Sequence, residues 1–156
     1  MILKKTKIII LTLILTMIIA LAGCTNNSAT NTKFSGQKIT VYKSEFCGCC
    51  GGYVAELEKN GFDVEVIKTE DLATIKEKYN VPKDMQSCHT AVIGDYFIEG
   101  HVPLQAVEKL LDEKPEIDGI ALPNMPAGAP GMPGSKKGTW MINSVTDGKS
   151  KEFMKI

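Results

Sequence analysis

The sequence contains no arginine, and all 18 of its positively charged residues are lysines. It therefore lacks the forked guanidinium group that binds phosphate or carboxylate through paired hydrogen bonds. Positive charge is not in excess either. Three of the lysines, Lys4, Lys5 and Lys7, lie in an expected leader, and the rest of the chain has 15 lysines and 18 acidic residues. We therefore expect no nucleic-acid partner. The hydrophobic fraction of 44% in 156 residues fits one modest domain with a buried core.

The N-terminal leader has a short lysine cluster followed by an almost unbroken apolar run from Ile8 to Leu21, which ends in Leu-Ala-Gly-Cys at Cys24. This pattern resembles a bacterial lipoprotein signal. The alternative is an uncleaved membrane helix, but the run is shorter than the roughly 20 residues that a spanning helix needs. We expect residues 1–23 to be a signal peptide and the Cys24 sulfur to carry lipid. The location would then be extracytoplasmic, anchored to the cell membrane, on the periplasmic side if a second membrane exists.

Residues 24–37 are rich in Asn, Thr, Ser and Lys and contain a single aromatic residue, Phe34. A segment of this polarity buries too little apolar surface to fold, so we expect a lipidated, flexible tether. Cysteines outside the cytoplasm meet an oxidising environment, in which an idle thiol tends to be capped or paired. The three closely spaced cysteines that follow therefore need a disulfide partner or a metal.

Residues 38–120 show the alternating patterns of strands and helices. In chain order the expected elements are a strand at 38–43, a helix from about 49 to 60, a strand at 62–67, a helix at 72–80 capped by Asp71, two short strands at 91–93 and 96–98, and a helix with Pro103 in its first turn. Strand, helix, strand implies a right-handed parallel crossover. The order βαβαββα is that of an α/β, thioredoxin-like fold with a mixed sheet.

Residues 121–156 have a different composition. A loop rich in proline, glycine and methionine is followed by a pattern that predicts a terminal hairpin, with its turn at Asp147-Gly148. Neither a helix nor a central strand is compatible with the prolines of this loop. We expect both segments to pack on the thioredoxin-like domain.

Three cysteines, Cys47, Cys49 and Cys50, lie at the turn from the first strand to the first helix. Free N–H groups and the positive end of the helix dipole favour the thiolate there. Thiolates bind soft metal ions and also attack disulfides, so both chemistries are open. Cys47 and Cys50 have the spacing of a redox pair. Cys49 would point about 100° away from Cys50 on a helix, so the three sulfurs are better placed to bridge several ions than to surround one.

The expected topology brings distant residues to this turn. The third strand runs antiparallel to the first, so its beginning at Cys88-His89 returns to the same edge of the sheet. The fourth strand then places His101 at that edge. Four cysteines and both histidines of the chain would therefore gather on one rim. A chance scatter of six such residues would rarely produce this, which favours a metal site.

Four motifs follow one another along the domain. They are Tyr42-Lys43-Ser44 before Cys47-Gly48-Cys49-Cys50, then residues 86–92, residues 98–103 and residues 123–132. Together they resemble the CopG family of bacterial copper-resistance proteins, which are thioredoxin-fold proteins of the cell envelope. The resemblance implies copper binding through the cysteines, with a redox step between the two copper oxidation states. Copper ions, a copper-exporting ATPase or another envelope copper protein are the partners that it suggests.

The sulfur ligands that we expect for copper are Cys47, Cys49 and Cys50, with Cys88 closing the site from the facing strand. Thiolates that bridge soft monovalent copper would form a multinuclear cluster. Cys88 stands near the position at which thioredoxins have a cis-proline beside their active site. A metal ligand would here take the place of the proline ring that blocks this position in thioredoxins. The alternative for Cys88 is a small buried apolar side chain.

Each of the two histidines has an alternative to metal binding. Neighbours on a strand point to opposite faces, so His89 reaches the same ion as Cys88 only if the backbone is irregular; otherwise it would hydrogen-bond a ligand. We expect His101 to be a ligand, with helix capping as the alternative. Met125 and Met132 carry thioethers that suit monovalent copper, but loop methionines also pack as adaptable apolar side chains, and we favour that role slightly.

Three functions are compatible with these residues. The first is a copper-binding protein of copper tolerance that sequesters or hands on Cu(I) and changes its oxidation state on the way. The second is a thiol:disulfide oxidoreductase with Cys47 and Cys50 as catalytic residues. The third is a structural zinc site of Cys47, Cys50, Cys88 and one histidine, which requires a chain that unfolds without metal. We favour the first and leave open whether the protein is an enzyme.

Overall fold

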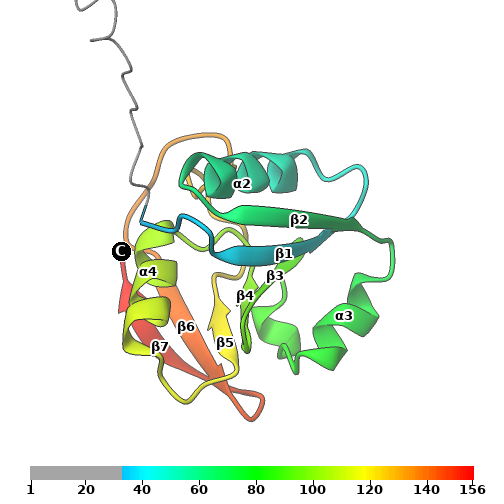
Figure 1. Ribbon diagram of the computed structural model, residues 1–156. Coiled ribbons are helices and arrows are strands. Elements are labelled where there is room, and N and C mark those ends of the chain that lie inside the picture. Colours follow the sequence, from blue (N-terminus) through cyan, green and yellow to red (C-terminus); the bar gives the residue numbers. More distant parts are fainter. Residues whose placement is uncertain (1–32) are drawn as a thin grey trace, which may run out of the picture. The chain divides into compact units, whose positions relative to one another are not determined.

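The computed structural model describes residues 33–156; the expected signal peptide, Cys24 and the tether up to residue 32 lie outside the described residues. Its elements are β1 (Lys38–Lys43), α2 (Gly48–Lys59), β2 (Asp63–Lys68), α3 (Leu72–Lys78), a 3-10 turn η1 (Lys83–Met85), β3 (His89–Ile93), β4 (Tyr96–Glu99), α4 (Leu104–Glu113), β5 (Gly119–Ala121), β6 (Met141–Thr146) and β7 (Lys149–Lys155) (Figure 1). The predicted order βαβαββα is confirmed. Within residues 33–156, no helix has the length and apolar character that crossing a bilayer requires.

Among residues 33–156, seven strands form one mixed sheet in the order β2-β1-β3-β4-β5-β6-β7. β1 and β2 are parallel. β3 pairs with β1 and β4 pairs with β3, both in antiparallel register. β5 then joins β4 in parallel and β6 in antiparallel register, so the terminal hairpin extends the same sheet. The expected boundary at residue 120 therefore needs correction, because it falls inside β5. The sequence does not predict β5, since three residues are too few to show a period.

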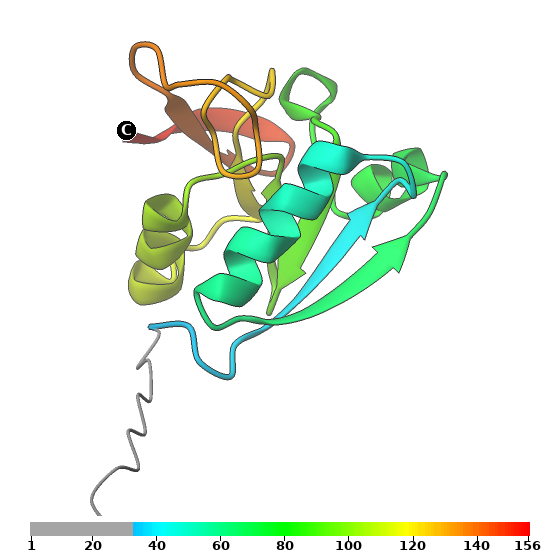
Figure 2. The ribbon, with the colours of Figure 1, turned by 90° about the horizontal axis from the view of Figure 1, so that it is seen from above.

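The helices cover both faces of the sheet. α2 contributes Tyr53 and Leu57, and α4 contributes Val107 and Leu110, to a core that they share with one face of the strands. The opposite face, on the side of α3, carries a smaller apolar cluster of Val81, Phe97 and Val145. Figure 2 shows α2 and α3 on opposite sides of the strands. Successive residues of β3 and β4 thus alternate between the core under α2 and α4 and the layer beside α3.

The folded unit begins earlier than the sequence predicts. Phe34 is 7% exposed and its ring stacks on Phe62 with centroids 4.4 Å apart, while Lys33 pairs with Glu108 and Asp112. Residues 33–37, which we assigned to the tether, therefore belong to the domain. A single aromatic side chain, Phe34, attaches this segment to the domain because Phe62, directly before β2, offers an apolar ring on which it stacks.

Candidate metal centre

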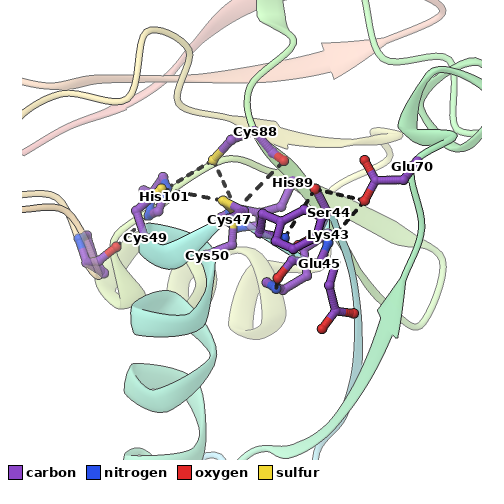
Figure 3. The surroundings of a disulfide bond; sticks show 12 residues. Lys43, Ser44, Glu45, Cys47, Cys49, Cys50, Glu70, Cys88, His89 and His101 are labelled. Atoms are coloured by element: carbon purple, nitrogen blue, oxygen red, sulfur yellow. Dashed lines mark hydrogen bonds between the residues drawn. A yellow bond between two sulfur atoms is a disulfide. The ribbon is translucent and has the colours of Figure 1, made fainter.

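The structure places all six predicted metal-site side chains at one rim of the sheet. Their ligand atoms form two overlapping groups, within each of which all atoms lie within 4.8 Å of one another: Cys47, Cys49, Cys50 and Cys88, and Cys50, Cys88, His89 and His101. Figure 3 shows the Cys88 sulfur facing the sulfurs at the start of α2. Cys50 and Cys88 belong to both groups, so they lie at the middle of the site. The convergence that the topology implies is therefore present.

Cys47 and Cys50 are joined by a disulfide, with their Cα atoms 5.4 Å apart. Cys49 and Cys88 are free, and the Cys49 sulfur lies 3.5 Å from that of Cys47. A disulfide sulfur carries no thiolate charge, so this pair must take up two electrons before all four sulfurs can bind a metal. The structure thus holds the oxidised form of the pair.

Cys88 lies in a bend directly before β3 rather than in the strand itself. Its sulfur is 3.4 Å from His89 Nδ1 and 3.1 Å from His101 Nε2. The bend supplies the irregular backbone that allows two consecutive residues to point to the same place. Burial raises the pKa of the Cys88 thiol to about 11, and the neighbouring Cys49 adds to the shift. A soft cation would have to displace the proton from this thiol.

His101 is oriented by the proline- and glycine-rich loop. Its Nδ1 lies 2.7 Å from the carbonyl oxygen of Pro130, and a carbonyl only accepts hydrogen bonds, so Nδ1 carries the proton. The lone pair is therefore on Nε2, the nitrogen that faces Cys88. Burial lowers the pKa of His101, which keeps the ring neutral. A neutral imidazole whose other nitrogen donates to a carbonyl is the usual form of a metal-ligating histidine.

His89 is a fully buried member of the second group. Its ring packs against Tyr53 and His101, with centroid distances of 4.7 and 4.8 Å, and its Nε2 has no hydrogen-bond partner among the described residues. A buried nitrogen without a hydrogen-bond partner ordinarily lowers the stability of the fold by about 1–3 kcal/mol. The presence of such a nitrogen here fits a side chain that binds a ligand. Burial, followed by the charges of His101, Lys76 and Lys43, lowers the pKa of His89 to about 3.

Acid is expected to destabilise the metal-free protein through His89. Its pKa is about 3 in the folded chain against an ordinary value of 6.5, so the unfolded chain binds the additional proton as the pH falls below about 6.5. The free energy of unfolding should then drop by roughly 1.4 kcal/mol per pH unit towards pH 3. Urea unfolding at pH 7 and pH 5 would measure this. His89→Gln should have the shallower slope, and an equal slope in both proteins would contradict the assignment.

A buried polar network on the α3 side of the sheet is not predicted by the sequence patterns. Lys76 is 5% exposed and Glu99 is 0% exposed, and Glu99 Oε1 accepts from Lys76 Nζ at 2.5 Å. The same oxygen accepts from the Ser87 N–H at 2.6 Å, and Oε2 accepts from the Thr90 hydroxyl at 2.6 Å. The signal in the sequence is Glu99 itself, which shares a strand face with Phe97 and is therefore directed inward.

The two loop methionines differ. Met132 is half-buried and packs against the main core, in line with the apolar role that we favour for it. Met125 is 41% exposed and has a left-handed backbone with φ of 42°. The Met125 side chain is therefore open to solvent, whereas Met132 is part of the packing against the core.

Comparison with known proteins gives two solved structures of "Copper resistance protein copG", in its Form 1 and Form 2. Each is 36% identical to this chain with a TM-score of 0.71, and the match covers 77% of this chain and 97% or 98% of the other. This chain belongs to the CopG-like copper-resistance family. The thioredoxin-like fold is confirmed by the same match. The DUF411 family model, described as a protein of unknown function, matches residues 85–132, and no curated protein matches the sequence.

The matched segment of the family model contains three of the six clustered residues. They are Cys88, His89 and His101, and the segment also includes Glu99 and Pro130. The CopG structures are matched over nearly their whole length, so the likeness to them extends beyond this segment. The chain thus combines membership of the CopG-like family with a sulfur-rich rim whose side chains could hold a metal ion.

Proposed function

We propose that this CopG-like chain is an extracytoplasmic copper-binding protein of copper tolerance that binds Cu(I) at the rim formed by Cys47, Cys49, Cys50 and Cys88. The observation that carries the proposal is the approach of four sulfurs within 4.8 Å of one another. His89 and His101 complete the donor set from the second group. The two matching structures are of proteins named for copper resistance, which supports copper as the metal.

The donor types favour soft monovalent copper. The two groups contain sulfur and neutral imidazole nitrogen and no carboxylate, and such donors prefer Cu(I) to hard cations such as Mg²⁺ or Ca²⁺. Cys50 and Cys88 belong to both groups, so their thiolates can bridge ions held on either side. A multinuclear thiolate cluster follows from this arrangement more readily than a single ion with four ligands.

The Cys47–Cys50 pair can couple copper binding to a change of oxidation state. In one direction, the reduced pair gives up two electrons to two Cu(II) ions. The two thiolates lose one electron each and form the disulfide, and the two Cu(II) ions become two Cu(I) ions. The reverse step reduces the disulfide and leaves two Cu(II). The disulfide of the structure is the oxidised partner in this exchange.

Copper titration of residues 25–156, which contain the whole compact unit, tests the proposal. The chain is reduced without oxygen and titrated with Cu(I), and bound copper and the near-ultraviolet thiolate-to-copper absorption are measured. We expect more than one tightly bound Cu(I) per chain. The matched control is the same protein with the Cys47–Cys50 disulfide intact, which should bind less. Uptake of no more than one weakly held copper by the reduced chain would contradict the cluster.

Chelation separates copper binding from a structural zinc site. The main core consists of apolar residues and includes none of the six clustered residues, so its packing does not depend on a metal. The reduced, metal-free chain should therefore keep its far-UV circular dichroism spectrum. Leu57→Ala provides a positive control, because a cavity in this core should lower the free energy of unfolding by about 2–5 kcal/mol. Loss of the spectrum on chelation alone would favour structural zinc instead.

A thiol:disulfide oxidoreductase remains the second candidate, because Cys47 and Cys50 form a disulfide at the start of α2. That function needs only these two cysteines. It predicts that Cys49→Ser and Cys88→Ser leave the reduction of insulin disulfides intact while Cys47→Ser abolishes it. Copper binding predicts instead that Cys49 and Cys88 matter for metal uptake. Equal loss of reductase activity in all three variants would exclude the simple redox pair.

The lipid anchor at Cys24 and the extracytoplasmic location are part of this proposal, and their support is the lipoprotein-like pattern of residues 1–24. A copper-exporting ATPase or another envelope copper protein would be the exchange partner. Membrane fractionation of the full chain and of Cys24→Ala tests the anchor: we expect the variant to leave the membrane fraction. A variant that stays there would contradict the lipid attachment.

A further inference from the structure

The network of Lys76, Glu99 and Thr90 lies on the face of the sheet away from the copper rim. Lys76 Nζ reaches Glu99 Oε1 at 2.5 Å and the Thr90 hydroxyl at 3.1 Å, and both charged side chains are almost completely buried. An ion pair taken out of water in this way adds little net stability compared with apolar residues of similar size. The pair therefore calls for an explanation other than stability.

The network holds the segment that ends in Cys88. Glu99 Oε1 accepts the backbone N–H of Ser87 at 2.6 Å, directly before the central cysteine of the site. The bond is directional and charge-assisted, so it fixes the position of the Ser87 backbone more closely than apolar packing would. Replacement of Glu99 by an apolar residue would remove this acceptor.

The same glutamate also positions the backbone that leads to His101. The carbonyl of Glu99 accepts from the Leu122 N–H at 3.0 Å, and the next residue, Gly100, donates to the His89 carbonyl at 3.0 Å. Gly100 has φ of +76°, and a Cβ there would lie 2.7 Å from both the Leu122 carbonyl oxygen and Ser87 Oγ. The segments that precede Cys88 and His101 are therefore in direct contact at this point.

We propose that Glu99, with Lys76 as its charge partner, is a positioning residue that holds Cys88 and His101 at the distance needed for copper binding. The inference rests on the proposed function, since it assigns a role within that copper site. Cys88 Sγ and His101 Nε2 lie 3.1 Å apart, and each belongs to a segment that Glu99 holds, one through its side chain and one through its backbone. The layer beside α3 would thus tune a metal site on the opposite face.

The double variant K76M/E99L separates positioning from stability. It replaces the buried ion pair by apolar side chains of similar size, which commonly leaves a protein as stable or more stable. It also leaves the Ser87 N–H and the buried Thr90 hydroxyl without their Glu99 acceptors, which offsets part of that gain. We expect the free energy of unfolding to stay close to that of the wild type, the Cu(I) affinity to fall by about 10–100-fold, and the Ser87 amide to exchange faster in the metal-free protein.

Two further variants complete the series. Glu99→Gln keeps an oxygen for the Ser87 N–H and should restore most of the affinity. Val145→Ala weakens the apolar cluster on the same face without touching Ser87 and should leave the affinity within about twofold of the wild type. Glu99→Asp shortens the reach to Ser87 but keeps the charge, so it tests the same bond if K76M/E99L fails to fold, and we expect it to lower the affinity.

The measurements are competition titrations with Cu(I) on reduced residues 25–156 and amide exchange by NMR on the metal-free chain. A stable K76M/E99L protein with wild-type affinity would overturn the inference, as would an equal loss of affinity in Val145→Ala. If the wild type itself takes up no copper, the proposed function fails. The exchange rate of the Ser87 amide then still decides the positioning role, and an unchanged rate in K76M/E99L would overturn it.

Discussion

Cys88→Ser is expected to reduce Cu(I) uptake by the reduced chain more than any other single change outside the turn at residues 47–50. Among the described residues, Cys88 is the only cysteine of the two groups that lies outside the turn into α2, and it belongs to both groups. A hydroxyl is a poor ligand for a soft cation, so the bridge between the groups is lost. The affinity should fall by more than the roughly 100-fold that loss of an orienting residue costs. Competition titration and thiolate-to-copper absorption measure the effect.

Ser87→Ala is the matched control for this substitution. Ser87 precedes Cys88, and its hydroxyl is buried without a partner among residues 33–156, so its removal leaves no new unpaired group. Its backbone N–H, which binds Glu99, is retained. We expect wild-type copper uptake from this control. Near-normal stoichiometry and absorption in Cys88→Ser would instead place the copper on the turn alone and contradict the shared site.

Gly131→Ala is expected to displace the loop that orients His101. Gly131 has φ of +78°, and a Cβ there would collide with the Tyr53 nitrogen and lie 2.7 Å from the Cys49 carbonyl oxygen, both in the backbone of α2. The left-handed backbone and the overpacking together should cost about 2–4 kcal/mol of unfolding free energy. Since the neighbouring Pro130 carbonyl accepts from His101 Nδ1, the histidine should also lose its fixed tautomer. Urea unfolding and NMR of the imidazole nitrogens measure the two effects.

Gly138→Ala isolates the contribution of the backbone. Its φ of +72° is close to that of Gly131, but a Cβ there meets no atom within 4 Å. It should therefore cost only about 1–2 kcal/mol and leave His101 unchanged. If the two alanine variants were equally stable and had the same imidazole spectrum, the loop would not be pressed against α2 as described.

The rim has an oxidised and a reduced state, which differ in whether Cys47 and Cys50 form a disulfide. In the oxidised state the Cys47–Cys50 disulfide withholds two sulfurs, and the remaining donors are Cys49, Cys88 and the two imidazoles. In the reduced state all four sulfurs are available within the same small volume. The rim therefore needs no large movement of the chain to change from one state to the other, because the atoms are already within 4.8 Å.

Much of the site was predictable because its signals are local in the chain or follow from topology. The three cysteines at the start of α2 follow an alternating strand pattern, and Cys88 and His101 stand at the ends of strands that the order βαβαββα returns to the same edge. The place of Phe34 was predicted wrongly, since the polar residues around it obscure its contact with Phe62. The burial of Lys76 was not predicted, because it depends on the ion pair with Glu99, which lies 23 residues further along the chain.

The sequence by itself determined the order of strands and helices from β1 to α4 and the edge of the sheet at which the cysteines and histidines meet, because apolar periods, caps and turn residues act between near neighbours. Only the tertiary structure decided which nitrogen of His101 carries the proton, that Lys76 and Glu99 are buried together, and that the terminal hairpin continues the sheet. Each of these depends on the distance between atoms far apart in the chain, and such a distance exists only once the core has packed.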